Sequence, residues 1–161
     1  MIAKPLCTPD PAVLLACKIA QHFEGLVLKP YLDPRGIPTI GYGSMYYEDG
    51  SKVTMDDPEI TESRAKILLY SKMEGFVSIV DQTINVSLNS SQTAALGSFC
   101  YNVGPVAFEE STLVKLLNLG RYDAVPVQLL LWDHAGSEVL GGLEARREAE
   151  ANLFKDGILP Q

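Results

Sequence analysis

The chain of 161 residues is 47% hydrophobic and 20% charged, and its 13 basic and 20 acidic residues give a formal net charge of −7 at pH 7. This length suits a single domain with a substantial core, and no apolar run approaches the roughly 20 residues that span a bilayer. The acidic balance argues against non-specific binding to nucleic acid, which requires basic side chains that neutralise phosphates.

The first predicted helix covers residues 11–24. Asp10 and Pro11 form a typical start, a capping residue followed by proline at the first helical position, and Gly25 ends the pattern. Apolar residues recur at helical spacing: Leu15, Ala16, Ile19, Ala20 and Phe23. We therefore expect Glu24 at the C-terminus of this helix, where the negative end of the dipole favours a carboxyl group that keeps its proton.

Residues 27–45 are predicted to form a small antiparallel sheet. Glycines and prolines alternate there with Tyr, Leu, Ile and Thr, which is typical of short strands joined by tight turns. Residues 46–53 add a further turn, for which the Asp49-Gly50 pair is the hairpin signal.

The rest of the chain is predicted to be helical. A long helical pattern begins at Thr61, and a helix of about twenty residues spans roughly 30 Å, which is enough to join two lobes. Asn89 and Gln92 have the spacing of a capping box. The later helices are expected from Ser111 or Thr112 to Gly120, from Asp123 to near Trp132, and from Leu143 to Phe154.

Glu24, Asp33 and Thr39 are the candidate catalytic residues. Glycosidic hydrolysis needs one carboxylic acid to protonate the leaving oxygen and one carboxylate to act on water or on the sugar cation. Glu24 suits the acid, whereas Arg35 next to Asp33 favours the ionised form of Asp33. The Thr39 hydroxyl can hold a water. The spacing alone is also typical of two surface carboxylates in turns.

Other polar residues indicate no metal or cofactor site. His22 and His134 lack metal-ligand spacing and are expected on the surface. Cys7, Cys17 and Cys100 are an odd number without a Cys-x-x-Cys pair, so we expect reduced thiols, with a Cys7–Cys17 bridge as the alternative. Trp132 is expected in the core, with stacking on a sugar as the alternative. Arg146, Arg147 and Glu148 are typical of a solvated helix face, with one arginine reaching a cleft carboxylate as the alternative.

The Glu24, Asp33 and Thr39 spacing resembles the catalytic triad of the phage-type lysozymes, the endolysin family that includes the lysozyme of T-even phages. Residues resembling the family occur in order from about residue 12 to 155. They are Glu24-Gly25, Tyr31-Leu32-Asp33, Thr39-Ile40-Gly41-Tyr42-Gly43, Gln92, Ala95-Leu96, Ser98-Phe99, Asn102-Val103-Gly104, Ser111-Thr112-Leu113, Asn118, Gly120, Trp132, Gly142-Leu143, Arg146-Arg147, Glu150 and Leu153-Phe154.

The resemblance implies an α+β, lysozyme-like fold that forms one domain over residues 1–161. A sheet-containing lobe would cover about residues 12–60, a connecting helix about 61–81, and a mainly α-helical lobe about 85–157, with a cleft between the lobes. The implied activity is hydrolysis of the β-1,4 bond between N-acetylmuramic acid and N-acetylglucosamine of bacterial peptidoglycan. Inversion at the sugar is expected, with retention as the alternative. No cofactor or metal is expected, and the result would be host lysis at the end of the phage cycle.

The resemblance also implies a role for each matching residue. Glu24 would be the general acid, Asp33 would activate water or stabilise positive charge, and Thr39 would hold the water. The substrate-binding positions would be Met45, Tyr101 and Asn102, and Arg146 would approach and orient the catalytic glutamate. Ser44 departs from the family pattern, which often has His there, so an ion pair at that place is expected to be missing.

The resemblance further implies how the protein reaches its substrate. The first ten residues lack the features of a secretory signal, and no stable membrane anchoring is expected. The protein would be a monomer that stays in the host cytoplasm until a holin releases it to the periplasmic peptidoglycan. Two alternatives remain, a lytic transglycosylase and a non-catalytic wall-binding or tail-structural module.

Overall fold

The computed structural model describes residues 8–135, 138–139 and 141–161, and its first helix is the one that the capping pattern predicts. Helix α1 (Pro11–Phe23) begins after Asp10, whose carboxylate accepts the Ala12 N–H at 2.8 Å. At the other end the Glu24 N–H still donates to the Ala20 carbonyl at 2.7 Å, but the Glu24 backbone is extended. Glu24 is therefore fixed at the point where the helix ends.

Strands β1 (Val27–Leu32) and β2 (Pro38–Gly41) form a two-stranded antiparallel sheet. Tyr31 pairs with Thr39, and residues that lie opposite each other in such a sheet share a face. Asp33 follows β1 directly and opens the turn to β2. Two isolated antiparallel bridges continue the predicted pattern beyond β2, Ile40 with Ser44 and Tyr46 with Lys52.

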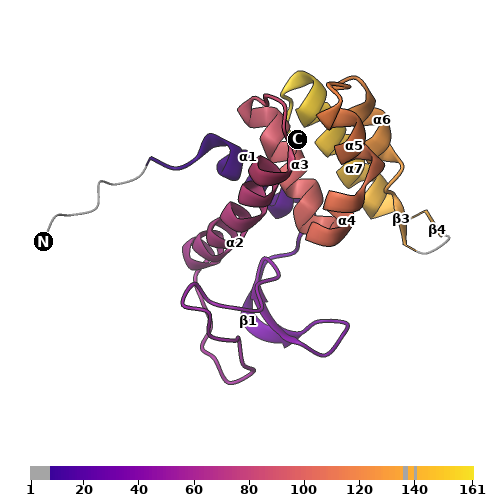
Figure 1. The fold of residues 1–161 in the computed structure, drawn as a ribbon. Coiled ribbons are helices and arrows are strands. Elements are labelled where there is room, and N and C mark those ends of the chain that lie inside the picture. Colours follow the sequence, from indigo (N-terminus) through magenta and orange to yellow (C-terminus); the bar gives the residue numbers. More distant parts are fainter. Residues whose placement is uncertain (1–7, 136–137, 140) are drawn as a thin grey trace, which may run out of the picture.

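Helix α2 (Glu62–Thr83) joins the sheet to the other helices, as Figure 1 shows. The Thr61 hydroxyl caps its N-terminus by accepting a backbone N–H of the first turn at 3.1 Å. Leu68 of this helix packs with Ile40 and Val53 in a small apolar cluster, whereas the following apolar residues of the helix belong to the main core. Because α2 contributes to both clusters, it fixes the sheet relative to the helices.

Helix α3 (Ser90–Val103) lies at the centre of the helical part, where it contacts α1, α2 and α7, and its residues 93–100 are all buried. Asn89 and Gln92 form the predicted capping box, with hydrogen bonds of 2.8 and 3.0 Å. The remaining elements are α4 (Pro105–Glu110), α5 (Thr112–Asn118), α6 (Ala124–Leu130), the hairpin of β3 (His134–Ala135) and β4 (Glu138–Val139), and α7 (Gly141–Asp156).

Parts of the helical region differ from the sequence expectations. Helix α4 was not predicted, because six residues between Gly104, with a φ of 96°, and the next cap are too few to show a period. The β3–β4 hairpin was not predicted either, since each strand has two residues. Helix α7 begins at Gly141 rather than Leu143. Asp123 precedes α6, but its carboxylate does not cap the helix and instead accepts from Arg121 at 3.4 Å.

The other polar and sulfur residues mostly lie where the sequence predicts. Cys17 and Cys100 are free and buried, and burial raises the pKa of both thiols to about 12, which makes them poor nucleophiles. Cys7 is outside the described residues. His22 and His134 are exposed. Trp132 packs edge-on against Phe99, with ring centroids 5.3 Å apart.

Across the described ranges, none of the helices combines the length and the apolar character that a membrane crossing requires.

Candidate active site

The Glu24 carboxylate forms an ion pair with a buried arginine of the last helix, α7. Arg146 Nη1 lies 2.9 Å from Glu24 Oε1, and the arginine side chain is 3% exposed whereas that of Glu24 is 32% exposed. The arginine is thus inside the protein and the carboxylate is partly open. Of the two sequence interpretations, the solvated helix face is wrong for Arg146 and the arginine that reaches a cleft carboxylate is confirmed.

Arg146 is itself fixed by a buried polar cluster. Arg146 Nε lies 3.4 Å from Glu150 Oε1, the Ser98 hydroxyl donates to the same oxygen at 2.8 Å, and Arg147 Nε lies 2.8 Å from Glu150 Oε2. Glu150 and Arg147 are fully buried. The carboxylate of Glu150 therefore forms ion pairs with two buried arginines and holds one of them against Glu24.

Asp33 is fixed by the turn that it opens. Its Oδ1 accepts the backbone N–H groups of Arg35 at 2.8 Å and Ile37 at 2.9 Å, and its Oδ2 accepts Nε and Nη2 of Arg35 at 3.0 and 2.8 Å. The Ile37 N–H contributes most to lowering the pKa of Asp33, and Arg35 lowers it further. Asp33 is therefore ionised at neutral pH, as the sequence predicts, and the largest single cause is the Ile37 N–H rather than the charge of Arg35.

Thr39 lies on β2 with a 3% exposed side chain, and its hydroxyl donates to the Ile37 carbonyl at 2.9 Å. This hydrogen bond uses the only proton of the hydroxyl. The lone pairs remain, so Thr39 can hold a water as an acceptor but not as a donor.

The predicted residues meet in one cavity of about 220 Å³, which lies between the sheet and the helices. Six of the seven predicted site residues line it, and the seventh, Arg146, is linked to the cavity through its ion pair with Glu24. The lining residues are Glu24, Tyr31, Asp33, Arg35, Thr39, Gly43, Met45, Lys72, Tyr101 and Asn102. Two carboxylates, one partly open and one held ionised, therefore face the same small volume.

The three candidate binding residues are each anchored to a neighbour. The Tyr101 hydroxyl donates to the Tyr42 carbonyl at 3.2 Å, and burial raises the pKa of Tyr101. Asn102 Oδ1 accepts from Arg147 at 2.7 Å, which leaves its amide hydrogens for a ligand. Met45 Sδ lies 3.5 Å from Nη2 of Arg35.

Comparison with known proteins now identifies the family. The family model described as phage lysozyme matches residues 21–150 of the chain. The chain belongs to the phage lysozyme family. It is 38% identical over 131 residues to the endolysin of Salmonella phage P22, and this match covers 81% of this chain and 88% of that protein.

A second relative and a solved structure agree with this membership. The endolysin of Bacillus phage B103 is 36% identical over 139 residues, a match that covers 86% of this chain and 52% of that protein. The chain thus spans about half the length of the Bacillus phage endolysins that it matches. The solved endolysin of Escherichia coli O157:H7 phage FAHEc1 superposes with a TM-score of 0.82 at 33% identity, covering 98% of this chain and 99% of that one.

Lys72 is a cavity residue of this lysozyme-family chain that the sequence analysis did not select. It lies on α2, its Nζ donates to the Gly43 carbonyl at 3.3 Å, and Nζ lies 4.9 Å from the centre of the Tyr101 ring. Burial lowers the pKa of Lys72, an effect that Glu24 opposes. Lys72 follows the buried Leu68 by four residues, and residues four apart share a helix face. A lysine on the apolar face of a helix was the signal that could have found it.

Ser44, at the position where the family often has His, is buried. Within the part of the chain that the structure describes, its hydroxyl has no hydrogen-bond partner. An ion pair cannot form from this side chain, as the sequence analysis expects.

Proposed function

We propose that the protein is a phage endolysin with muramidase activity. It hydrolyses the β-1,4 bond between N-acetylmuramic acid and N-acetylglucosamine of bacterial peptidoglycan and lyses the host at the end of the phage cycle. The observation that carries this proposal is the shared cavity of Glu24, Asp33 and Thr39. Glycosidases need a carboxylic acid and a carboxylate beside the scissile bond, and family membership supports the same class of substrate.

Glu24 is proposed as the general acid. Arg146 binds its Oε1, which leaves Oε2 to carry the proton toward the cavity. Arg146 therefore orients the carboxyl group of Glu24 in the cavity. A bound sugar displaces water from the cavity, which strengthens the electrostatic interactions inside it.

Asp33 and Thr39 are proposed to act on the water. Thr39 accepts one hydrogen of the water, and Asp33, ionised by its hydrogen bonds to Ile37 and Arg35, accepts the proton that leaves. The water oxygen bonds to the anomeric carbon as the bond to the leaving oxygen breaks, and Glu24 gives that oxygen its proton. Attack from the face opposite the leaving group inverts the anomeric centre.

The test is release of soluble fragments from dye-labelled peptidoglycan by the wild-type protein and by Glu24→Gln. The variant keeps the shape of the side chain but has no acidic proton to give, so we expect activity to fall by roughly 10²- to 10⁴-fold. Thermal unfolding and sedimentation with the insoluble wall serve as controls for folding and binding. Undiminished release by the variant would contradict the role of Glu24.

The two alternatives predict different results. A lytic transglycosylase works with a single acid and no water, so the ionised Asp33 and the acceptor Thr39 would have no purpose in it. A non-catalytic wall-binding or tail-structural module would sediment with the wall and release no dye.

The proposal includes the route to the wall. The protein is a monomer that remains in the host cytoplasm until a holin opens the membrane to the periplasm. Expression in Escherichia coli should lyse cells only when a holin is co-expressed, and lysis without one would contradict this part of the proposal.

A further inference from the structure

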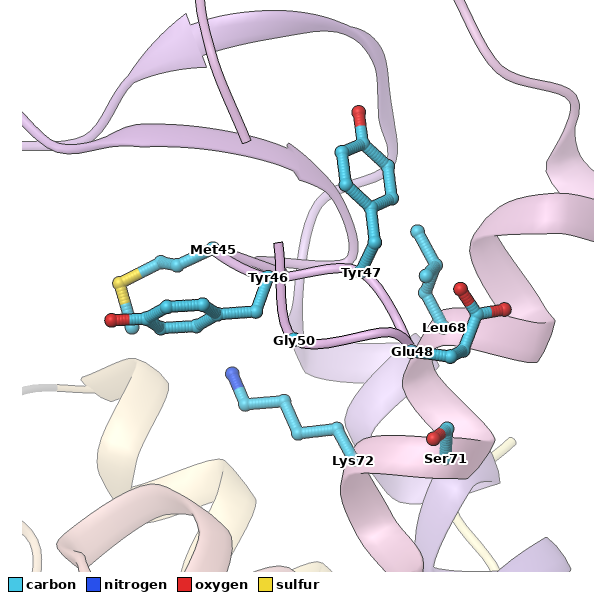
Figure 2. Close-up of a pocket in the computed structure, with 8 residues that line it drawn as sticks. All are labelled: Met45, Tyr46, Tyr47, Glu48, Gly50, Leu68, Ser71 and Lys72. Atoms are coloured by element: carbon cyan, nitrogen blue, oxygen red, sulfur yellow. The ribbon is translucent and has the colours of Figure 1, made fainter. Parts of the chain in front are cut away.

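A second pocket, also of about 220 Å³, adjoins the candidate catalytic cavity. It lies between the chain segment 45–50 and helix α2, and it shares Met45 and Lys72 with the first cavity. In Figure 2 the Lys72 side chain extends from α2 toward the ring of Tyr46 and the thioether of Met45. A ligand that fills the catalytic cavity can therefore extend past Lys72 into this pocket.

Lys72 places its ammonium group where the two pockets meet, and no carboxylate forms an ion pair with it among the described residues. Among the described residues, none of the ion pairs within 4.0 Å includes Lys72. The one hydrogen bond that Lys72 makes to the described part of the chain, from Nζ to the Gly43 carbonyl, is long at 3.3 Å, and an ammonium group can donate three. The partial burial of Lys72 lowers its pKa, which is the sign of a charge that has lost water without gaining a full counter-ion.

The acidic residue of the pocket does not neutralise Lys72. Glu48 lines the pocket, but its two carboxylate oxygens bind Nη1 and Nη2 of Arg64 at 2.5 and 2.8 Å. The Ser71 hydroxyl adds a neutral donor to the wall. The pocket as a whole therefore favours an anion.

We propose that this pocket is a subsite for a carboxylate of the substrate, with Lys72 as the residue that binds it. The inference rests on the proposed function and specifies its substrate class. The glycan strand of peptidoglycan has no free carboxylate where its lactyl groups are amide-bonded to peptides, so the carboxylates belong to those peptides. Lys72 makes the enzyme select strands that carry acidic peptides.

The test uses soluble, uncrosslinked glycan strands with intact peptides, and the same strands after their carboxylates are amidated with carbodiimide and ammonia. Amidation removes the charge and hardly changes the shape. For the wild-type protein we expect KM to be about tenfold higher on the amidated strands, the effect of one lost charge-assisted hydrogen bond. The loss should appear in KM rather than in kcat, because Lys72 contributes binding and not chemistry.

Two variants separate binding from a structural role. Lys72→Met keeps the length of the side chain without its charge, so it should show the higher KM on both substrates. Lys72→Arg keeps the charge and should still distinguish them. If Lys72→Met does not fold, Lys72→Gln, which also removes the charge, takes its place in the comparison with the wild-type protein and Lys72→Arg.

The outcomes also separate this inference from the proposed function. Cleavage of both strands by the wild-type protein with the same KM would overturn the subsite and leave the muramidase intact. A wild-type protein that cleaves neither strand would overturn the muramidase itself. Equal discrimination by Lys72→Met and the wild-type protein would also overturn the role of Lys72.

Discussion

Arg146 Nη1 lies 2.9 Å from Glu24 Oε1, although 122 positions separate the two residues in the chain. The contact joins the last helix, α7, to the end of the first helix, α1. It depends in turn on Glu150 and Ser98, which hold Arg146. The orientation of the proposed acid is therefore set by the folding of the whole helical part rather than by the segment that contains Glu24.

Replacing Arg146 should reduce both activity and stability. Arg146→Met removes the group that orients Glu24 and leaves the fully buried Glu150 with one arginine fewer. We expect kcat to fall by about 10- to 100-fold, as for a misplaced catalytic group, and the free energy of unfolding to fall by about 3 kcal/mol, as for a broken buried ion pair. Steady-state kinetics and urea unfolding measure the two effects. Arg146→Lys is the matched control and should recover part of the stability. A wild-type kcat for Arg146→Met would show that Arg146 does not orient the catalytic glutamate.

Thr39 should contribute to catalysis by accepting a hydrogen bond from water through the lone pairs of its hydroxyl. Thr39→Val has nearly the same shape but cannot accept a hydrogen bond from water, so kcat should fall by roughly 10- to 100-fold with little change in KM. Thr39→Ser keeps the hydroxyl and should retain most of the activity. Equal kinetics for the Val and Ser variants would show that the hydroxyl has no part in holding the water.

Asp33 should make stability depend on acid pH. Its pKa in the folded protein lies below the ordinary value of 3.8, chiefly because of the Ile37 N–H. The ionised group therefore stabilises the fold above the unfolded pKa, and this contribution is lost as pH falls through the folded pKa. Urea unfolding should give wild type a constant advantage over Asp33→Asn at higher pH and a shrinking one below pH 3.8. An exposed matched control is Asp56→Asn, and an advantage that stays constant in acid would contradict the lowered pKa.

The buried hydroxyl of Ser44 should lower the free energy of unfolding of the protein. Its side chain is 2% exposed, and the described residues offer its hydroxyl no hydrogen-bond partner. Ser44→Ala should raise the free energy of unfolding by about 1 kcal/mol, because an unpaired buried hydroxyl costs free energy. Chemical denaturation measures the change. A loss of stability of the same size would mean that the hydroxyl makes a contact that stabilises the protein.

The sequence predicted the parts of the site that local chain geometry determines. Glu24, Asp33 and Thr39 lie within one short segment, and the cap at Asp10, the helix end and the turn after β1 each have a local signal. These signals predicted the elements that carry the three side chains, and the resemblance to the phage-type lysozymes predicted that the three residues form one site. The small antiparallel sheet and the long joining helix of the α+β fold were also predicted from local signals in the sequence.

The contacts made over long distances in the chain could not be predicted in the same way. Arg146 had two interpretations, because its surroundings in sequence are charged. It is buried where α7 packs against α1 and α3, contacts that the sequence does not show. Lys72 was missed, since its position in the cavity follows from the rotation of α2 against the sheet. Helix α4 was too short for its periodicity to be seen.

Hydrolysis of the glycan is tested most directly by asking whether the protein adds water to the bond that it cleaves. Peptidoglycan is digested in ¹⁸O-labelled water, the fragments are reduced at once with borohydride, and their muramic acid ends are analysed by mass spectrometry. Fragments cut in ordinary water and then incubated in labelled water control for exchange. A muramidase gives reducing muramic acid ends that carry one labelled oxygen. Unlabelled 1,6-anhydro ends would show a transglycosylase and contradict the proposed roles of Asp33 and Thr39.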